Sequence, residues 1–220
     1  DENTKKKRRD YGVLNFNSPT LVVKLAVLDS GSYFRVFVFR SFVIRIGLAS
    51  PMSDSTGRRI LGLDPGLHFT GYAVLEASPR GPIVCEAGVI RGTIKETKID
   101  LAQRLRHIYT STVEVIEQFR PQTVVVEQLY AHYKHPRTAI LMGHARGILF
   151  LAAAQYDVPV VSYNATLIKK TITGHGRASK LQIQRTMQRE LGLSQLPEPP
   201  DVADALAVAL CHYYIQKLAG

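Results

Sequence analysis

Two short apolar runs that each end in an acid constrain the fold of this chain more than any other feature. Residues 59–64 read Arg-Ile-Leu-Gly-Leu-Asp, and residues 123–127 read Thr-Val-Val-Val-Glu. Runs this short and this apolar are typical of strands that are buried on both faces of a sheet. Asp64 and Glu127 therefore stand where a buried strand leaves the sheet, which is where α/β proteins place their ligand sites.

The surrounding pattern predicts both strands and helices. Further strands are expected at 70–76, 82–90 and 158–162, where apolar residues are bounded by turn signals. Apolar spacing and helix breakers predict helices at 98–119, 136–156, 164–171, 179–191 and 200–217. An order of three strands, helix, strand, helix, strand and then helices indicates an α/β fold with a five-stranded mixed sheet flanked by helices.

Two more acids lie at the start of the last predicted helix. Asp201 and Asp204 are three residues apart, so both project from one side of that helix. If this end packs beside the two strand ends, four carboxylates converge and repel one another. A divalent cation with a preference for oxygen ligands, Mg²⁺ or Mn²⁺, relieves that repulsion. Two such ions about 4 Å apart can bind the attacking and leaving oxygens of a phosphodiester.

Each acid also has a structural interpretation when it is taken alone. Asp64 precedes Pro65-Gly66 and could be a turn residue, and Asp201 could be a helix N-cap. Glu127 directly follows three valines, so it is expected near buried surface. Asp204 lies in an apolar helix and needs a partner or a metal. The set is more specific than any of its members.

The charge of the chain favours a polyanionic partner. Lysine and arginine number 28 against 18 acids, a formal net charge of +10. Nucleic acid is the first candidate and an acidic membrane surface the second. No apolar run reaches the ~20 residues of a membrane span. Cys85 and Cys211 form no CxxC pair, which disfavours a zinc site or disulfide framework and fits a reducing cytoplasm.

The first 51 residues read differently from the rest. Residues 5–9 are all Lys or Arg, and a solvated charge run is preferred there over a basic arm that binds DNA. Alternation around 34–46 predicts a strand or two. Met52 opens a polar stretch just before the first strong strand. We therefore expect residues 1–51 to be an N-terminal extension, poorly ordered or separate from the core, and 52–220 to be the functional domain.

Four segments of residues 52–220 resemble one family of nucleases. They are Ile60–Gly66 with the following Thr70-Gly71-Tyr72, Val126-Glu127-Gln128, Ala145-Arg146-Gly147, and Asp201–Ala207. Together they are similar to the RuvC family of Holliday junction resolvases, which has a ribonuclease H-like fold. The resemblance spans about residues 58–217.

This resemblance implies a homodimeric, Mg²⁺-dependent endonuclease of DNA recombination and repair, in which Mn²⁺ can substitute. Such an enzyme binds a four-way DNA junction, nicks two strands symmetrically, leaves 5′-phosphate and 3′-hydroxyl ends, and works with a branch-migration motor. Asp64, Glu127, Asp201 and Asp204 match the four catalytic acids of the family, which would hold two metal ions.

The resemblance also implies residues that contact DNA. Tyr130 matches an aromatic that stacks near the crossover, although a tyrosine that fills a loop groove is an equal alternative. Lys169 and Lys180 match lysines near the scissile phosphate. Arg177 would widen this basic surface. For His175, in a polar loop, solvent exposure is preferred over phosphate contact.

Two other functions compete with a junction nuclease. A junction-binding module of the same fold would bind without cutting, but it gains nothing from four acids beside phosphate. A nucleotide-hydrolysing enzyme of the wider fold could also use an Asp-x-Gly turn like residues 64–66. That function calls for a second glycine-rich phosphate loop after a later strand, and none is convincing here.

Overall fold

The computed structural model describes residues 22–23, 38–39, 57–92, 100–129 and 136–219, and it divides the chain into units of residues 1–40 and 41–220. In the first unit, β1 (Val22–Val23) pairs antiparallel with β2 (Val38–Phe39). The second strand lies within 34–46, where alternation predicts strand.

A five-stranded mixed sheet forms the centre of the second unit. Its strands are β3 (Arg59–Asp64), β4 (Phe69–Ser78), β5 (Gly81–Arg91), β6 (Thr123–Glu127) and β7 (Val160–Tyr163). They lie in the order β5-β4-β3-β6-β7. The first three are antiparallel, whereas β6 runs parallel to both β3 and β7. The predicted sheet is confirmed, and the two strands that end in acids are parallel neighbours.

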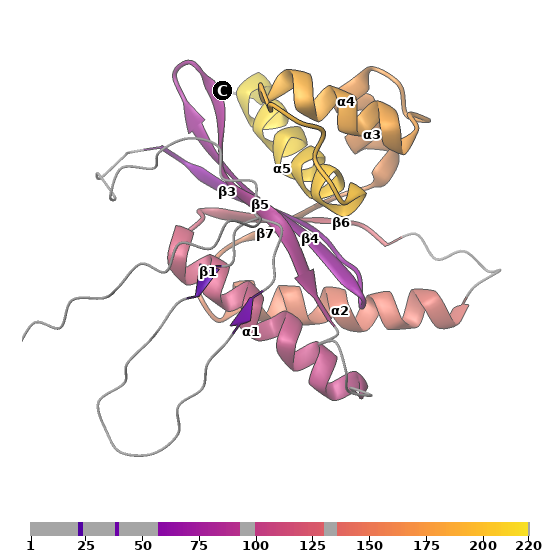
Figure 1. Ribbon diagram of the computed structural model, residues 1–220. Helices are drawn as coiled ribbons and strands as arrows, with labels where there is room; N and C mark the ends of the chain where they lie inside the picture. Colours follow the sequence, from indigo (N-terminus) through magenta and orange to yellow (C-terminus); the bar gives the residue numbers. More distant parts are fainter. Residues whose placement is uncertain (1–21, 24–37, 40–56, 93–99, 130–135, 220) are drawn as a thin grey trace, which may run out of the picture. The chain divides into compact units, whose positions relative to one another are not determined.

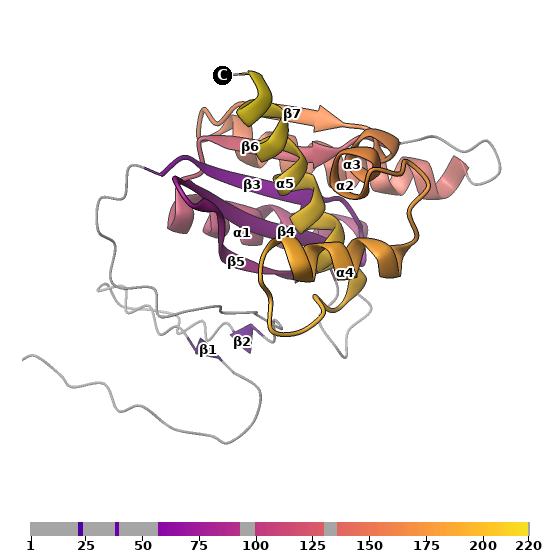
Figure 2. The same cartoon turned by 90° about the horizontal axis from the view of Figure 1, so that it is seen from above.

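Five helices cover the two faces of the sheet. They are α1 (Leu101–Phe119), α2 (Pro136–Ala154), α3 (Ala165–Thr173), α4 (Lys180–Glu190) and α5 (Pro200–Ala219). Figures 1 and 2 show α1 and α2 on one face and the other three on the opposite face, with α5 directly over the strands. The result is the three-layer α/β arrangement that the element order predicts.

Strand alternation supplies a separate core to each face. Leu61 and Leu63 point into the core beneath α1 and α2, whereas Ile60 points into the core beneath α5. On the neighbouring strand, Val125 joins the α5 core and the valines on either side of it join the other. This period of two explains why the strands read as continuous apolar runs, because both faces are covered.

Capping residues explain small differences between predicted and observed helix ends. Predictions begin two helices at residues 164 and 179. In the structure, Asn164 accepts the backbone N–H of Leu167, and Ser179 forms a reciprocal capping box with Gln182. Both residues are therefore N-caps that stand just before the helix rather than inside it. None of the described helices is both long and apolar enough to cross a membrane.

Candidate metal and DNA site

Two of the four acids lie side by side at the same edge of the sheet. Asp64 ends β3 and Glu127 ends β6. The two strands are parallel, and Leu63 pairs with Val126, so the acids that follow leave the sheet together. Both are only partly covered. The sequence-based placement of these two acids at neighbouring strand ends agrees with the structure.

A glycine lets the start of α5 reach these strand ends. Gly71 is the β4 partner of Asp64. A Cβ atom at Gly71 would lie 2.1 Å from the carbonyl oxygen of Asp201 and 3.3 Å from the Cβ of Ala205. The first turn of α5 therefore rests on the backbone of β4. Any side chain at this position would collide with the backbone of Asp201, so the start of α5 would have to shift.

A second glycine repeats this contact one step along the helix. A Cβ atom at Gly62 would lie 2.5 Å from the carbonyl oxygen of Ala205 and 2.8 Å from the Cβ of Ala209. Sequence reasoning assigned no role to either glycine. The signal was present as two glycines in adjacent predicted strands and small residues four apart in an apolar helix. That pattern is typical of a helix that lies unusually close to a sheet.

Helix α5 brings the other two acids to the same place. It begins at Pro200, so Asp201 lies inside the first turn rather than at the N-cap position. Burial raises the pKa of Asp64 to about 8, and the negative charges of Glu127, Asp204 and Asp201 add to that rise. Glu127, Asp201 and Asp204 therefore all lie within electrostatic reach of Asp64.

The same crowding acts on the other acids. Burial raises the pKa of Glu127, and the charge of Asp204 raises it further. Burial also raises the pKa of Asp204, while Lys180 and Lys169 oppose the rise for both. Lys180 places its Nζ 3.9 Å from Asp204 Oδ2, although 72% of its side chain is exposed. Its ammonium group can therefore pair with Asp204 and still be open to a phosphate from the solvent side.

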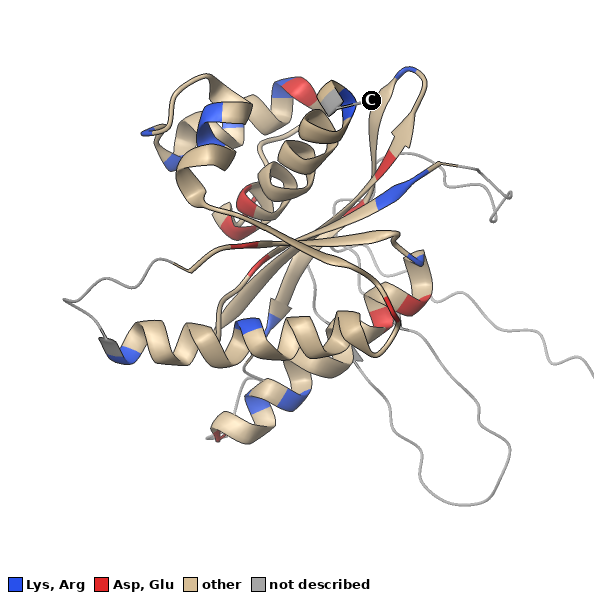
Figure 3. Ribbon diagram, turned by 180° about the vertical axis from the view of Figure 1, so that it is seen from behind, with Lys and Arg blue, Asp and Glu red and all other residues tan. Residues whose placement is uncertain are grey.

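Of the residues predicted to contact DNA, three lie within the described part of the chain and one does not. Lys169 and Lys180 lie close enough to Glu127 and Asp204 to lower the pKa values of both acids. Arg177 lies exposed on the loop between α3 and α4 and adds positive charge to that surface. Figure 3 shows the blue segments of α3 and α4 close to the red first turn of α5. Tyr130 lies outside the described residues.

The donor set suits a hard divalent cation. The pKa values of Asp64, Glu127 and Asp204 are raised, and a cation bound by these carboxylate oxygens would relieve their mutual repulsion. Within the described ranges, however, no three Asp, Glu, His or Cys side chains are already gathered as a ready ligand set. The effect of the acids on one another's pKa values depends mainly on where the backbone places them. A carboxylate can still turn about its side-chain torsions to bind an ion. Asp64, Glu127, Asp201 and Asp204 are thus candidate ligands for such a cation.

Arg146, in the Ala-Arg-Gly segment, supports the end of β6 from the opposite face. Its guanidinium donates to Ser162 Oγ at 2.8 Å and, more weakly, to the backbone oxygen of Glu127 at 3.4 Å. It also stacks over the ring of Phe150, 4.2 Å from the centroid. The side chain thus ties α2 to the ends of β6 and β7. Its role was visible in sequence only as part of the family motif.

Comparison with known proteins identifies the family of this chain. The family model described as Crossover junction endodeoxyribonuclease RuvC matches residues 60–212. The RuvC of Rhodopirellula baltica is 51% identical over 158 residues, which are 71% of this chain and 86% of that protein. The RuvC of Thermotoga maritima is 43% identical over 155 residues, 70% of this chain and 89% of that protein.

A solved structure extends the similarity to three dimensions. Thermus thermophilus RuvC in complex with a Holliday junction substrate superposes with a TM-score of 0.66 at 29% identity, covering 74% of this chain and 96% of that chain. The matched region holds all four acids and both glycines that seat α5. The chain belongs to the RuvC family of crossover junction endodeoxyribonucleases.

Proposed function

We propose that this chain resolves four-way DNA junctions by metal-dependent hydrolysis at Asp64, Glu127, Asp201 and Asp204. The observation that carries the proposal is the placement of these acids at two adjacent strand ends and at the start of one helix, where burial and the other three charges raise the pKa of Asp64 to about 8. Charges held this close are a strained arrangement unless a cation joins them. The Thermus relative was solved with a Holliday junction substrate, which supports the choice of DNA.

The chemistry is hydrolysis of a phosphodiester. Water adds to phosphorus, the bond to the 3′ oxygen breaks, and the products are a 5′-phosphate and a 3′-hydroxyl. Mg²⁺ held in pairs by the acids would activate the water and stabilise the leaving oxygen, and Mn²⁺ can substitute. The acids themselves orient the ions, and Lys169 and Lys180 neutralise the phosphate from the side of α3 and α4.

Two further DNA contacts belong to this proposal. Arg177 would bind backbone phosphate beside Lys180, because both lie on the exposed basic side of the α3–α4 pair. Tyr130 follows β6 by three residues, so it would stack on an opened base near the crossover. The expected effects differ, since loss of a phosphate contact weakens binding to all DNA and loss of stacking affects the junction centre.

Paired nicks require two active sites, and α2 offers a surface for a second copy. Ile140 is 62% exposed and Leu151 is 48% exposed on this helix. Between them, a Cβ atom added at Gly143 or Gly147 would meet nothing within 4 Å. Large apolar residues flanking open glycine positions on one helix suit a homodimer, in which each protomer cuts one strand.

The remaining expectations concern the surroundings of the nuclease. We propose that residues 52–220 form the endonuclease domain and that residues 1–51 are an extension outside it, since the family match starts at residue 60. The resemblance also implies a complex with a branch-migration motor. Cys85 and Cys211 are both free thiols, which suits a reaction in the cytoplasm.

Asp204→Asn tests the metal assignment. The variant keeps the shape of the side chain and the basic surface, so it should bind a synthetic four-way junction with nearly unchanged affinity. In Mg²⁺ its cleavage should fall below detection, whereas wild type should give paired nicks with ligatable ends. Cleavage by the variant at the wild-type rate would refute the metal assignment. Tight binding without nicks by wild type, in Mg²⁺ and in Mn²⁺, would favour a junction-binding module.

A further inference from the structure

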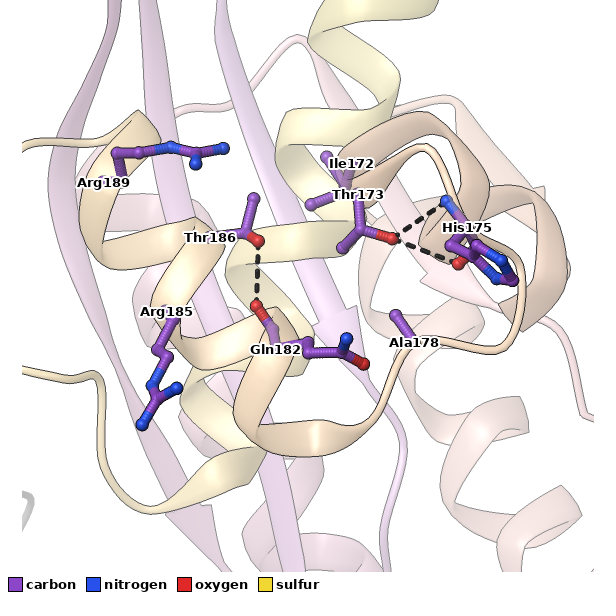
Figure 4. Close-up of a pocket in the computed structure, with 8 residues that line it drawn as sticks. All are labelled: Ile172, Thr173, His175, Ala178, Gln182, Arg185, Thr186 and Arg189. Atoms are coloured by element: carbon purple, nitrogen blue, oxygen red, sulfur yellow. Dashed lines mark hydrogen bonds between the residues drawn. The ribbon is translucent and has the colours of Figure 1, made fainter.

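A hollow lies between the end of α3 and the outward side of α4, apart from the four acids. It encloses about 290 Å³. Figure 4 shows its residues arranged around an open space, with two arginines from α4 on one side and His175 on the other. Ile172 and Ala178 are buried and form its apolar floor. We call this space the α3–α4 hollow.

The hydroxyl groups of the α3–α4 hollow are already committed to the backbone. Thr186 donates its hydroxyl hydrogen to the carbonyl oxygen of Gln182 at 2.8 Å. Thr173 donates to the carbonyl oxygen of Lys169 at 2.8 Å and accepts the backbone N–H of His175 at 3.1 Å. Both hydroxyl hydrogens are donated to backbone carbonyl oxygens, so neither is directed at a ligand.

The groups that remain for a ligand are mainly hydrogen-bond donors. The Oε1 atom of Gln182 accepts the backbone N–H of Ser179 at 2.7 Å, which leaves the amide NH₂ of Gln182. Arg185 forms no ion pair with any described residue. Arg189 pairs with Glu190 at 3.1 Å, but its side chain is 78% exposed, and such a pair contributes little. Two guanidinium groups and an amide NH₂ therefore favour an anion.

The hollow belongs to a strongly basic segment, residues 164–190, which contacts the acidic site through Lys180. Residues 164–190 contain six Lys or Arg and one acid, Glu190. Lys180 contacts Asp204 at the start of α4. Arg185 and Arg189 follow about 7.5 and 14 Å further along the helix axis, at 1.5 Å per residue. The larger distance is about the rise of four base pairs of duplex DNA.

We propose that the α3–α4 hollow binds backbone phosphates of one duplex arm, a few base pairs from the cleaved bond. The inference rests on the proposed function, because junction DNA supplies the arm. Guanidinium groups bind phosphate oxygens through paired hydrogen bonds, and Arg185 and Arg189 present two such groups on one side of α4. These contacts fix the angle at which an arm leaves the active site, and they read no sequence.

The salt dependence of binding tests this proposal. Arg185→Gln/Arg189→Gln is compared with Arg80→Gln/Arg106→Gln, which loses equal charge at exposed positions outside α3 and α4. Affinity for a four-way junction is measured across salt concentrations without divalent cation. The hollow variant should lose about two from the slope of log K against log salt, and the control should keep the wild-type slope. Equal slopes for the two variants would overturn the proposal.

Neutral phosphates locate the contact on the DNA. Methylphosphonates placed about four nucleotides from the cleaved bond should weaken binding by wild type but not weaken it further for Arg185→Gln/Arg189→Gln. Equal weakening in both proteins refutes the contact. If inorganic phosphate stabilises wild type but the junction data show no difference, the hollow is a free-phosphate site and the DNA proposal is wrong. Cleavage by wild type in Mg²⁺ is scored separately, so failure of the nuclease assignment is distinguishable.

Discussion

Helices α2 and α5 read alike in the sequence and differ in what happens to their apolar surface. Both are apolar around their whole circumference, with no polar stripe. In α5, Val202 and every residue from Ala205 to Cys211 are at most 1% exposed. In α2, Ile140 and Leu151 stay largely exposed. A helix that is apolar all round is thus either buried within its own chain or in need of a partner.

Glycine positions explain the difference between the two helices. On the α5 side, Gly62 and Gly71 belong to the sheet and let the helix backbone settle against the strands. On the α2 side, Gly143 and Gly147 belong to the helix itself and face open space. The first pair closes an intramolecular contact that delivers Asp201 and Asp204 to the strand ends. The second pair leaves room for a helix from another molecule.

Neutralising Asp64 should have the largest effect on the α5 side. Burial raises the pKa of Asp64 to about 8 in the folded protein, whereas the pKa of an aspartate in an unfolded chain is about 3.9. The folded state therefore holds an extra proton between these values, and its stability falls as pH rises through them. Without divalent cation, Asp64→Asn should be more stable than wild type by about 2–4 kcal/mol at pH 8, and it should not cut DNA.

Urea unfolding at pH 5 and pH 8, with EDTA or with Mg²⁺, measures this effect. The advantage of Asp64→Asn should shrink at pH 5, and Mg²⁺ should stabilise wild type but not the variant. Glu117→Gln removes an exposed acid on α1 and should follow the wild-type pH dependence. A pH-independent difference, or equal stabilisation of both proteins by Mg²⁺, would refute the account of a crowded metal site.

Gly71→Ala should have the next largest effect. The added methyl group would lie 2.1 Å from the carbonyl oxygen of Asp201, so α5 must shift. Overpacking of this kind costs about 1–3 kcal/mol, and a displacement of about 1 Å can lower kcat about 100-fold. Junction binding should change little. Glu117→Gln, at an exposed position on α1, is the control, and equal loss of cleavage in both would refute the seating role.

The sequence predicts most of this architecture and the members of the site, but not how they meet. Apolar runs ending at Asp64 and Glu127 predict the strands, because a strand that is covered on both faces carries apolar residues at successive positions. The spacing of Asp201 and Asp204 predicts that both project from the same side of one helix. The close contact of α5 with β4 depends on backbone atoms of Asp201 and the missing side chain of Gly71. No periodicity encodes a contact between residues so distant in sequence.

The hollow and the proposed dimer surface are not predicted from the sequence, for a related reason. Arg185 and Arg189 read as ordinary residues of a solvated helix face, and the donor surplus emerges once the capping box occupies Gln182. The exposed side of α2 cannot be told from the buried side of α5 by composition. In both cases the deciding fact is which groups already have a partner within the chain, a hydrogen-bond partner in the hollow and a packing partner on α2. That depends on the tertiary structure.

Leu151→Asp should break the surface that distinguishes α2 from α5. If α2 packs against a second copy, a charge at this half-exposed position should weaken dimerisation at least about tenfold, or ~1.4 kcal/mol. Sedimentation velocity over a concentration series measures the shift. Leu218→Asp, at an 87% exposed position near the end of α5, should leave the dimer intact. A wild-type protein that is monomeric throughout would contradict the assignment of α2.

Gly147→Ala should have the smallest effect and separates folding from association. A glycine inside a helix is about 0.5–1 kcal/mol less favourable than alanine, and open space surrounds this position in the protomer. In the Leu151→Asp background, where the protein should be monomeric, Gly147→Ala should therefore raise the free energy of unfolding by about that amount. In the otherwise wild-type protein the same methyl group should weaken the dimer, because a helix packed against Gly147 has no room for it. If alanine stabilises the monomer and leaves the dimer unchanged, the partner does not approach α2 at its glycines.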